Sequence, residues 1–462
     1  MDNETFTFIA HPVDWRYGSS EMRKILSVEN LIKTYARIEA TVAKVQSEYG
    51  VIPKDAADKI EEVAKNIDPF EVLNEEKKTR HDIVALINVI SSKVGDYSRF
   101  IHYGLTSQDI KDTAFALIIK ESLKLIEKKL IKLVQILVDH ADKWRDLPCV
   151  GRTHGVHANI YSFGHKFAIY ADEIMRHIER LNEGKKRFLV GKLSGAVGIH
   201  SVLGEKGLLI EETVMNKLGL HVSKFSNQVV PRDRYAEFFL ILSMISSTLD
   251  KIATEIRNLH RTEIGEAEES FAIGQVGSSA MPHKKNPIDS ENISGLSRIL
   301  RSLSLATLEN IVLWHERDLS NSSSERVLIV DYLLLLDEQL NRMIRVLENL
   351  KVNDKKILKN IELSRGTIFS EHLMYALIRK GIPRPIAHKY VQEISKKVYS
   401  LNQHLKEIAL KDEFIRKYLS EEEINKIFEP KKYILVVPKL IEELKESFKK
   451  ILEKYSLENE NK

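Results

Sequence analysis

Three segments of the chain repeat hydrophobic residues at intervals of three and four positions. The first contains Leu123, Ile126, Leu130, Leu133 and Leu137; the second runs from Tyr235 to Leu259 without proline or glycine; the third runs from Val327 to Leu350. Such spacing places an apolar stripe along one face of a helix. The pattern therefore predicts long helices, and the second would extend roughly 37 Å at 1.5 Å per residue.

Helices of this length usually belong to a bundle. We find no convincing alternation of apolar and polar residues that would predict strands. The run Leu333–Leu336 is apolar on more than one face, so it must be covered on all sides. We expect partner subunits to provide this cover, with burial inside one subunit as the alternative. The pattern predicts an all-α fold and an oligomer.

Glycine and proline gather in stretches 151–155, 191–207 and 265–287, which we interpret as loops. Loops on a rigid helical frame are common places for chemistry. The length of 462 residues suggests about three domains or one elongated body. The net charge of +4 is small against 70 basic and 66 acidic residues, which are mixed along the chain. This balance gives no support for a nucleic-acid partner.

Cys149 is the only cysteine, so no internal disulfide or cysteine-based zinc site can form. We interpret it as a small buried hydrophobe rather than a catalytic thiol. The first residues, MDNETFTF, lack the basic and apolar regions of a signal peptide. The longest apolar stretch, 327–336, is interrupted by Asp331 and is too short to span a bilayer. We expect a cytoplasmic protein without a membrane partner.

The most unusual segment is GQVGSSAMPHKKNPIDSEN at 274–292. Its serines Ser278 and Ser279 follow a glycine, and prolines flank the lysine pair that begins with Lys284. Exposed amides and lysines can bind anions. A serine could act as a base there only if amides and an ammonium group stabilised its alkoxide. The alternative interpretation is a flexible surface loop with a basic tip.

A second candidate is GRTHGVHANI at 151–160. On a helix, His154 and His157 would share a face, as metal ligands can. No HExxH pattern or partner cysteine accompanies them, so we expect no metal site. A histidine acid or base is better supported, because imidazole titrates near neutral pH. His157 fits a structural role better than His154 does.

Other candidates carry basic or hydroxyl groups. They are Arg16, Tyr17, Arg80, His81, Asp82, Thr106, Ser107, Arg317, Ser322 and Arg326. Arginines with a nearby serine suit phosphate oxygens, which a guanidinium group binds bidentately. Neither GxGxxG nor GxxxxGK[ST] occurs, so a dinucleotide fold and a phosphate loop are both unsupported.

The run GSSAMPHKKNP at 277–287 resembles the signature loop of the fumarase/aspartase superfamily. Within that superfamily, the histidine after Met-Pro resembles adenylosuccinate lyases and carboxymuconate cycloisomerases. Four further runs resemble the adenylosuccinate lyases: HPVDWRYG at 11–18, TRHDIVAL at 79–86, HYGLTSQDI at 102–110 and WHERDLSNSSSERV at 314–327. The chain departs from many members at Lys285, where they carry arginine, and at Asn321, where they carry histidine.

The resemblance implies three helical domains: an N-terminal domain over 1–110, a central long-helix bundle over 111–358 and a C-terminal domain over 359–462. It also implies a homotetramer whose active sites each draw on three subunits. The expected reaction is the elimination of fumarate from adenylosuccinate, giving AMP, and from the succinylated aminoimidazole carboxamide ribotide of purine biosynthesis. No metal or organic cofactor is expected, because the substrate carboxylate accepts the electrons.

The resemblance also assigns roles to residues. Ser278 is the expected base, His154 the acid, Lys284 the stabiliser of developing charge, Glu291 the partner of His154, and His81 a group that contacts and orients the substrate. The remaining contacts are expected from Arg16, Tyr17, Arg80, Asp82, Thr106, Ser107, Gln228, Asn286, Asn292, Arg317, Ser322 and Arg326. The competing interpretations are another lyase or a cycloisomerase of the same superfamily, a non-catalytic helical scaffold, and a nucleic-acid-binding helical protein.

Overall fold

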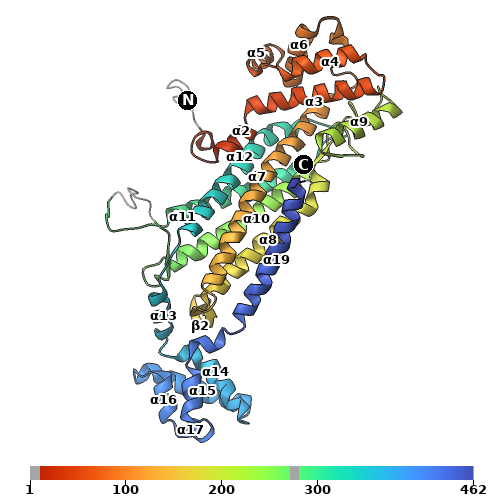
Figure 1. The fold of residues 1–462 in the computed structure, drawn as a ribbon. Helices are drawn as coiled ribbons and strands as arrows, with labels where there is room; N and C mark the ends of the chain where they lie inside the picture. The colour runs from red at the N-terminus through yellow and green to blue at the C-terminus, as the bar shows by residue number, and fades with distance from the viewer. Residues whose placement is uncertain (1–10, 271–279, 461–462) are drawn as a thin grey trace. The chain divides into compact units, whose positions relative to one another are not determined.

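The computed structural model describes residues 11–270 and 280–460, and helices dominate it (Figure 1). The long helices are α3 (Val28–Glu48), α7 (Ser107–Lys143), α8 (Phe163–Phe188), α10 (Asp233–Leu259), α11 (Ile288–Glu309), α12 (Ser320–Glu348) and α19 (Val437–Glu460). The shorter helices are α2 (Ser20–Ile25), α4 (Lys54–Lys65), α5 (Pro69–Thr79), α6 (Asp82–Val94), α9 (Glu205–Leu218), α13 (Asp354–Glu362), α14 (Ser370–Arg379), α15 (Arg384–Ser400), α16 (Leu405–Lys411), α17 (Glu413–Tyr418) and α18 (Glu421–Ile427). Short 3-10 turns are η1 (Pro12–Asp14), η2 (Gly95–Phe100), η3 (Thr367–Phe369) and η4 (Pro430–Tyr433). The predicted all-α class is confirmed.

The three segments with helical periodicity are helical in the structure. They correspond to α7, α10 and α12, and α10 ends at Leu259 as the pattern predicts. The α7 helix begins well before the periodic leucines, at Ser107, and the buried residues Ile110, Ala114 and Leu117 continue the spacing of three and four toward its start. Periodicity thus located the buried parts of these helices but not their ends.

The expectation of no strands is wrong in detail. The described residues contain β1 (Pro148–Thr153), β2 (Val156–Ser162), β3 (Val190–Gly191), β4 (His221–Val222), β5 (Ala267–Glu268) and β6 (Lys351–Val352). They form three two-stranded sheets: β1–β2 and β5–β6 are antiparallel and β3–β4 is parallel. Most are only two residues long, which is too short for alternation to be visible in the sequence.

Contacts divide the chain into two compact units. Unit 1 comprises Met1–Leu130, His177–Leu249 and Gly295–Asn341, and unit 2 comprises Ile131–Arg176, Asp250–Ser294 and Arg342–Lys462. In unit 1, α3 packs against α4, and α5 against α6; in unit 2, α14 packs against α15, and α15 against α16 (Figure 1). The predicted boundaries of three consecutive domains stay a prediction.

The core of unit 1 is aromatic where α7, α10 and α12 meet. The Phe239 and Tyr332 rings lie 4.8 Å apart between centroids. Tyr332 is fully buried, and its hydroxyl oxygen lies 2.9 Å from that of Ser243 and 3.0 Å from that of Ser304. The Tyr332 hydroxyl also donates to the Leu300 carbonyl at 2.9 Å. Burial therefore leaves this polar group hydrogen-bonded, as stability requires.

The leucine run of α12 is covered within the chain itself. Every residue of Leu333–Leu336 is at most 4% exposed. Our expectation that partner subunits cover this run is therefore wrong, and the alternative holds. Part of the cover is Gly18, whose positive φ of 84° and lack of a side chain permit close approach, since a Cβ there would lie 2.5 Å from Leu334 Cδ2.

The core of unit 2 includes Cys149, which is fully buried on β1. Burial raises the pKa of its thiol to about 12. The interpretation of this residue as a small buried hydrophobe is confirmed.

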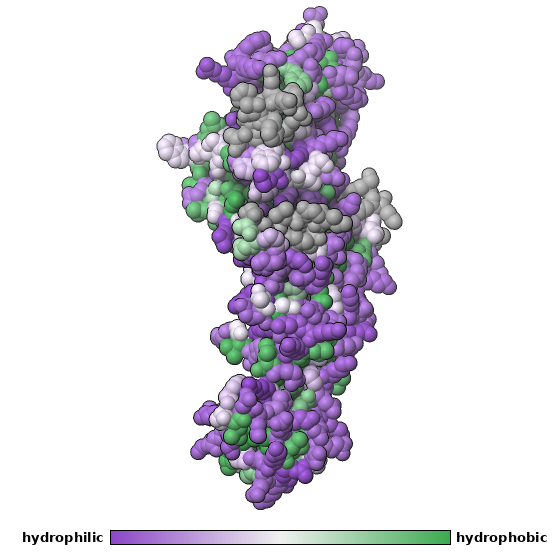
Figure 2. Space-filling model, turned by 90° about the vertical axis from the view of Figure 1, so that its left-hand side faces the viewer, coloured by the Kyte–Doolittle hydropathy of each residue, from purple (hydrophilic) through white to green (hydrophobic). Residues whose placement is uncertain are grey.

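Hydrophilic side chains predominate on the face shown in Figure 2, where hydrophobic ones form scattered patches. No helix in the described residues combines the length and apolarity needed to cross a bilayer.

Candidate active site

Unit 1 contains a pocket of about 760 Å³ at the starts of α6, α7 and α12. Seven of the residues singled out in the sequence line it: Arg80, His81, Asp82, Ser107, Arg317, Ser322 and Arg326. They come from three segments that are far apart in the chain. The structure thus brings together the arginines and hydroxyls that the sequence presented as isolated candidates.

The turn between α5 and α6 presents the first three of these residues. Arg80 ends α5 with a left-handed φ of 52°, an uncommon conformation for a residue other than glycine. His81 caps the N-terminus of α6, where its Nδ1 accepts from the Val84 amide at 3.3 Å. Its ring remains 46% exposed, so it is available to a ligand in the pocket.

Asp82 is already paired within the pocket. Its carboxylate accepts from Lys111 Nζ at 2.7 Å. Burial acts to raise the pKa of Asp82, but the charge and hydrogen bond of Lys111 outweigh it, so the pKa is lowered. Asp82 therefore stays ionised at neutral pH and fixes the Lys111 ammonium at the pocket wall.

The N-terminus of α7 brings Ser107 to the pocket. The preceding residue, Thr106, donates its amide to Asp109 Oδ2 at 2.8 Å, which closes the first turn. Unpaired amides and the helix dipole at such an end favour an anion. Thr106 itself does not line the pocket, although it was predicted as a contact.

Arg317 is held by two amide side chains. Its Nη1 donates to Gln228 Oε1 at 2.6 Å. With the Gln108 amide oriented so that its oxygen faces the guanidinium, Arg317 Nη2 lies 2.7 Å from that oxygen and the Gln108 nitrogen lies 3.2 Å from Asp112 Oδ1. Burial lowers the pKa of Arg317 below its usual value, although the group stays charged.

Sequence reasoning missed Gln108 and Lys111, which both line the pocket. Gln108 is only 5% exposed and directly follows Ser107, which was predicted. The signal that could have found Lys111 is its spacing of four from Ser107, because residues four apart share a helix face.

Arg16 and Tyr17 follow η1 and do not line this pocket. The Arg16 guanidinium lies over the Trp15 ring, 4.2 Å from its centroid. The Tyr17 carbonyl accepts from the Arg23 guanidinium, which also fixes the Val13 carbonyl. The role of Arg16 and Tyr17 as substrate contacts stays a prediction.

His154 lies at the tip of a hairpin in unit 2, so the stretch 151–155, interpreted as a loop, is the end of a strand followed by a turn. β1 and β2 pair in antiparallel fashion, and His154 and Gly155 form the two-residue turn with φ values of 54° and 76°. Positive φ at both positions is typical of a type I′ turn. His154 is exposed, whereas His157 lies in β2 with its pKa lowered by burial and by Arg152.

The stem of this hairpin is fixed by buried and bridging contacts. Arg152 forms a bidentate pair with Glu266, which is fully buried and also accepts from Asn360 at 2.8 Å. Farther along β2, Asn159 donates to Glu371 at 2.6 Å. These contacts hold the strands on either side of His154, so that the position of its backbone is set although its ring is exposed.

Residues 280–292 carry the other acid–base candidates. Lys284 is exposed, and its amide donates to the Met281 carbonyl at 3.0 Å in a turn. His260 Nε2 lies 3.0 Å from the Lys285 carbonyl and its Nδ1 accepts from the Glu269 amide at 3.2 Å. Through this ring, the end of α10 holds the segment that bears Lys284. Ser278, the predicted base, lies outside the described residues.

The start of α11 carries Glu291 and Asn292. Glu269 caps this helix by accepting from the Asp289 and Ser290 amides at 2.8 and 3.0 Å. Glu291 is exposed, and among the described residues no hydrogen bond joins it to His154. The predicted Glu291–His154 pair, the Asn286 and Asn292 contacts and the role of Lys284 stay predictions. No group of three or more possible metal-ligating side chains occurs in the part of the chain that is described.

Comparisons with known proteins identify the family to which the chain belongs. Family models match over residues 16–300, with the description lyase, and over 366–444, with the description adenylosuccinate lyase C-terminus. The adenylosuccinate lyase of Methanocaldococcus jannaschii is 45% identical over 95% of this chain and 96% of its own length, and that of Pyrococcus horikoshii is 44% identical over 94% and 98%.

Solved structures show the same fold at lower identity. A fumarate lyase from Mesorhizobium sp. BNC1 has a TM-score of 0.85 and 28% identity, covering 92% of this chain and 97% of its own. The 3-carboxy-cis,cis-muconate lactonizing enzyme of Pseudomonas putida has a TM-score of 0.85 and 27% identity, covering 95% and 98%. The fold alone therefore does not separate a lyase from a lactonizing enzyme, but the identities of 45% and 44% to the two adenylosuccinate lyases do. The chain belongs to the adenylosuccinate lyase family.

Proposed function

We propose that this carbon–nitrogen lyase eliminates fumarate from adenylosuccinate, giving AMP, and from the succinylated aminoimidazole carboxamide ribotide. The observation that carries the proposal is the unit 1 pocket, in which Arg80, Arg317 and Arg326 gather with Ser107 and Ser322. A succinylated nucleotide carries a phosphate and two carboxylates. Guanidinium and hydroxyl groups match such oxygens in charge and geometry.

The reaction breaks a C–N bond after a proton leaves the carbon beside a carboxylate. Three groups are needed: a base for that proton, an acid for the departing nitrogen, and cations for the dianionic carboxylate of the intermediate. We assign Ser278 as the base, His154 as the acid and Lys284 as the cation. Electrons from the broken C–H bond form the double bond of fumarate as the C–N pair leaves with the nitrogen.

The remaining groups bind and orient the substrate. His81 would position the reacting carbon from its exposed place at the pocket rim. Arg317, Ser322 and Arg326 would hold the phosphate. Thr106, Gln228 and Asn292 would contact the succinyl group and the base, and Glu291 would set the protonation of His154. This scheme uses no metal or organic cofactor.

We further propose that the enzyme is a cytoplasmic homotetramer in which different subunits supply the unit 1 pocket, His154 and the Ser278 segment. Large apolar side chains outside the core support association, including Phe225 at 90% exposed, Trp314 at 76% and Val312 at 74%. Contiguous exposed apolar surface commonly marks protein–protein contacts. Closed symmetry is the usual form of such an assembly.

A direct assay tests the function. Purified enzyme is mixed with adenylosuccinate or with the succinylated ribotide, and fumarate and nucleotide products are quantified by chromatography. Equimolar fumarate and AMP are expected from the first substrate. 3-Carboxy-cis,cis-muconate serves as the second arm, because a lactonizing enzyme shares the fold. Consumption of the muconate with no fumarate from either nucleotide would overturn the proposal.

A further inference from the structure

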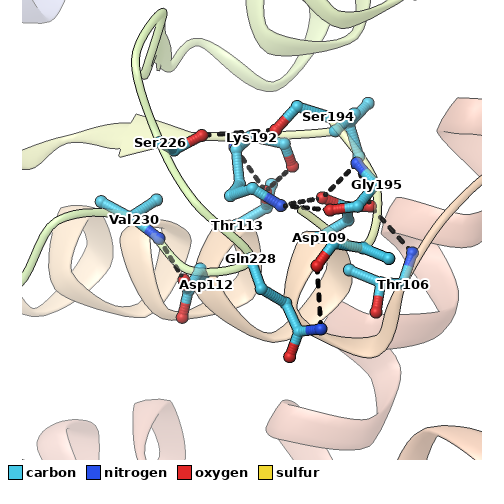
Figure 3. Close-up of polar contacts among 12 residues, drawn as sticks. Thr106, Asp109, Asp112, Thr113, Lys192, Ser194, Gly195, Ser226, Gln228 and Val230 are labelled. Atoms are coloured by element: carbon cyan, nitrogen blue, oxygen red, sulfur yellow. Dashed lines mark hydrogen bonds and ion pairs between the residues drawn. The ribbon is translucent and has the colours of Figure 1, made fainter. Parts of the chain in front are cut away.

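A buried ion pair lies next to the pocket and has no part in the chemistry proposed above. Lys192 Nζ donates to Asp109 Oδ1, and both side chains are fully buried (Figure 3). Taking two charges out of water is unfavourable before their attraction offsets the cost. An apolar pair could fill the same space, so this pair is not explained by stability alone.

The Asp109 carboxylate joins two segments of the chain. Its Oδ2 accepts from the Thr106 amide at 2.8 Å and from the Gly195 amide at 3.1 Å (Figure 3). The first bond fixes the turn that bears Thr106 and Ser107, and the second fixes the segment 192–196. A neutral amide at position 109 has one acceptor oxygen in place of two, so it could not make all three contacts.

The segment 192–196 is held on its other side as well. The Thr113 hydroxyl contacts both the amide and the carbonyl of Lys192 at 3.2 Å. The Leu193 amide donates to Glu211 at 2.6 Å. Burial raises the pKa of Asp109, while Lys192 and the two amides oppose that shift. The backbone around the ion pair is thereby fixed on several sides.

This fixed segment reaches the substrate contacts through Gln228. The Ala196 carbonyl accepts from Gln228 Nε2 at 3.0 Å, and Gln228 Oε1 accepts from Arg317 at 2.6 Å. A continuous path of hydrogen bonds therefore runs from Thr106 through Asp109 and the Gly195–Ala196 backbone to Arg317. Its two ends are groups assigned above to substrate binding.

We propose that Asp109 and Lys192 are a positioning pair for the elimination reaction: they hold the turn of Thr106 and Ser107 at a fixed distance from the Gln228–Arg317 pair. The inference rests on the proposed function, because it concerns substrate contacts of that reaction. A displacement of about 1 Å at such contacts can lower catalysis on the order of 10²-fold. The pair acts through other residues and does not itself touch the substrate.

The test compares single and double variants. Asp109→Leu or Lys192→Met leaves one buried charge unpaired, so each should lower the melting temperature. The double variant D109L/K192M removes both charges, together with the oxygens that accept from the Thr106 and Gly195 amides, and should recover part of the melting temperature. Its kcat/KM for adenylosuccinate should nevertheless stay about 10- to 100-fold below that of the wild type, chiefly through KM. Recovery of kcat/KM together with the melting temperature would reduce the pair to a structural role and overturn the proposal.

Two further variants make the result independent of folding. Lys185 and Glu127 form another ion pair of unit 1 at 2.8 Å, and K185M/E127Q should lower the melting temperature without changing KM. T113V keeps the shape of Thr113 and removes only the hydroxyl that holds Lys192, so KM should rise several-fold. An unchanged KM in T113V, or a raised KM in the control, would contradict the positioning role.

Hydrogen exchange separates failure of this inference from failure of the proposed function. The Thr106 and Gly195 amides should exchange at least about ten-fold faster in D109L/K192M than in the wild type and in K185M/E127Q. This readout needs no substrate, so it holds even if the wild type releases no fumarate. Unchanged protection of both amides would overturn the inference by itself.

Discussion

The unit 1 pocket and the tip of the unit 2 hairpin differ in how their polar groups are satisfied. In the pocket, Asp82 is paired with Lys111 and Arg317 with Gln228. At the hairpin tip, His154 is exposed, and none of the described residues hydrogen-bonds its ring. Its backbone, in contrast, is fixed through Arg152 and Glu266. Binding groups are thus preorganised inside one unit, whereas the proposed acid is presented at a surface on a rigid stem.

This difference suggests that the pocket serves substrate binding and the hairpin tip serves proton transfer. A preorganised pocket binds the nucleotide with little reordering of side chains. In the proposed tetramer, an exposed histidine can act when another subunit brings the substrate and the contacting residues to it. We infer that pocket changes will act mainly on KM and hairpin-tip changes mainly on kcat, and the predictions below test this split in order of expected effect.

The largest effect is expected from His154→Ala. A positioned general acid contributes roughly 10²–10⁴-fold, so kcat should fall by that factor while KM changes little. Fumarate release and far-ultraviolet circular dichroism measure the activity and the fold. His157→Ala is the matched control on the same hairpin and should stay within a few-fold of the wild type. Near-normal kcat in His154→Ala would remove this residue from the chemistry.

Arg326→Ala should raise KM by about 10- to 100-fold, because a charge-assisted hydrogen bond contributes about 1.5–3 kcal/mol. AMP affinity measured by calorimetry should fall by a similar factor, with kcat reduced less. Arg416→Ala, an exposed arginine of α17, controls for the loss of a charge. A fall in kcat at unchanged AMP affinity would contradict the assignment of this pocket to binding.

Glu211, which holds the Leu193 amide beside the pocket, predicts a pH effect. Burial, partly opposed by the Leu193 amide and Lys192, raises the pKa of Glu211 to about 7. The folded chain therefore retains a proton that the unfolded chain loses, and stability falls as pH rises from about 4.5 to about 7, by up to about 3 kcal/mol. Burial lowers the pKa of the neighbouring His200. Below the usual pKa of histidine this shift makes stability rise with pH, which opposes the effect of Glu211.

Glu211→Gln isolates that effect, because glutamine keeps an acceptor for the Leu193 amide and His200 is common to both proteins. The free energy of unfolding is measured in urea for both proteins. The value for the variant minus that for the wild type should increase as pH rises through this window. A constant difference between the two proteins from pH 4.5 to 7.5 would show that Glu211 does not titrate as described.

The smallest effect on activity is expected in the core. Tyr332→Phe removes the hydroxyl that meets Ser243, Ser304 and the Leu300 carbonyl, and should lower the free energy of unfolding by about 1–3 kcal/mol. Neither kcat nor KM should change more than about two-fold. A KM shift comparable with that of Arg326→Ala would show that a change in the core at Tyr332 alters substrate binding in the pocket.

The sequence predicted these two regions unequally. Periodicity located α7, α10 and α12 because each buries one apolar stripe, and the arginine and hydroxyl motifs named most of the pocket. The hairpin was missed, although the apolar residues Val156, Ala158 and Ile160 of β2 alternate with polar ones. Its tip, His154 and Gly155, owes its place to a two-residue turn. Gln108 and the Asp109–Lys192 pair were missed because long-range partners, 83 positions apart in the latter, leave no local pattern.

Subunit mixing tests the central claim, that one site combines the unit 1 pocket of one chain with His154 of another. His81→Ala and His154→Ala are each purified, shown to be inactive, and mixed under conditions in which isotope labels prove subunit exchange. A tetramer has a mass of about 212 kDa, four times the 53.1 kDa of one chain. Hybrid tetramers should contain some sites with both histidines and recover part of the wild-type fumarate release. No recovery despite proven exchange, or an active monomer in light scattering, would contradict the account.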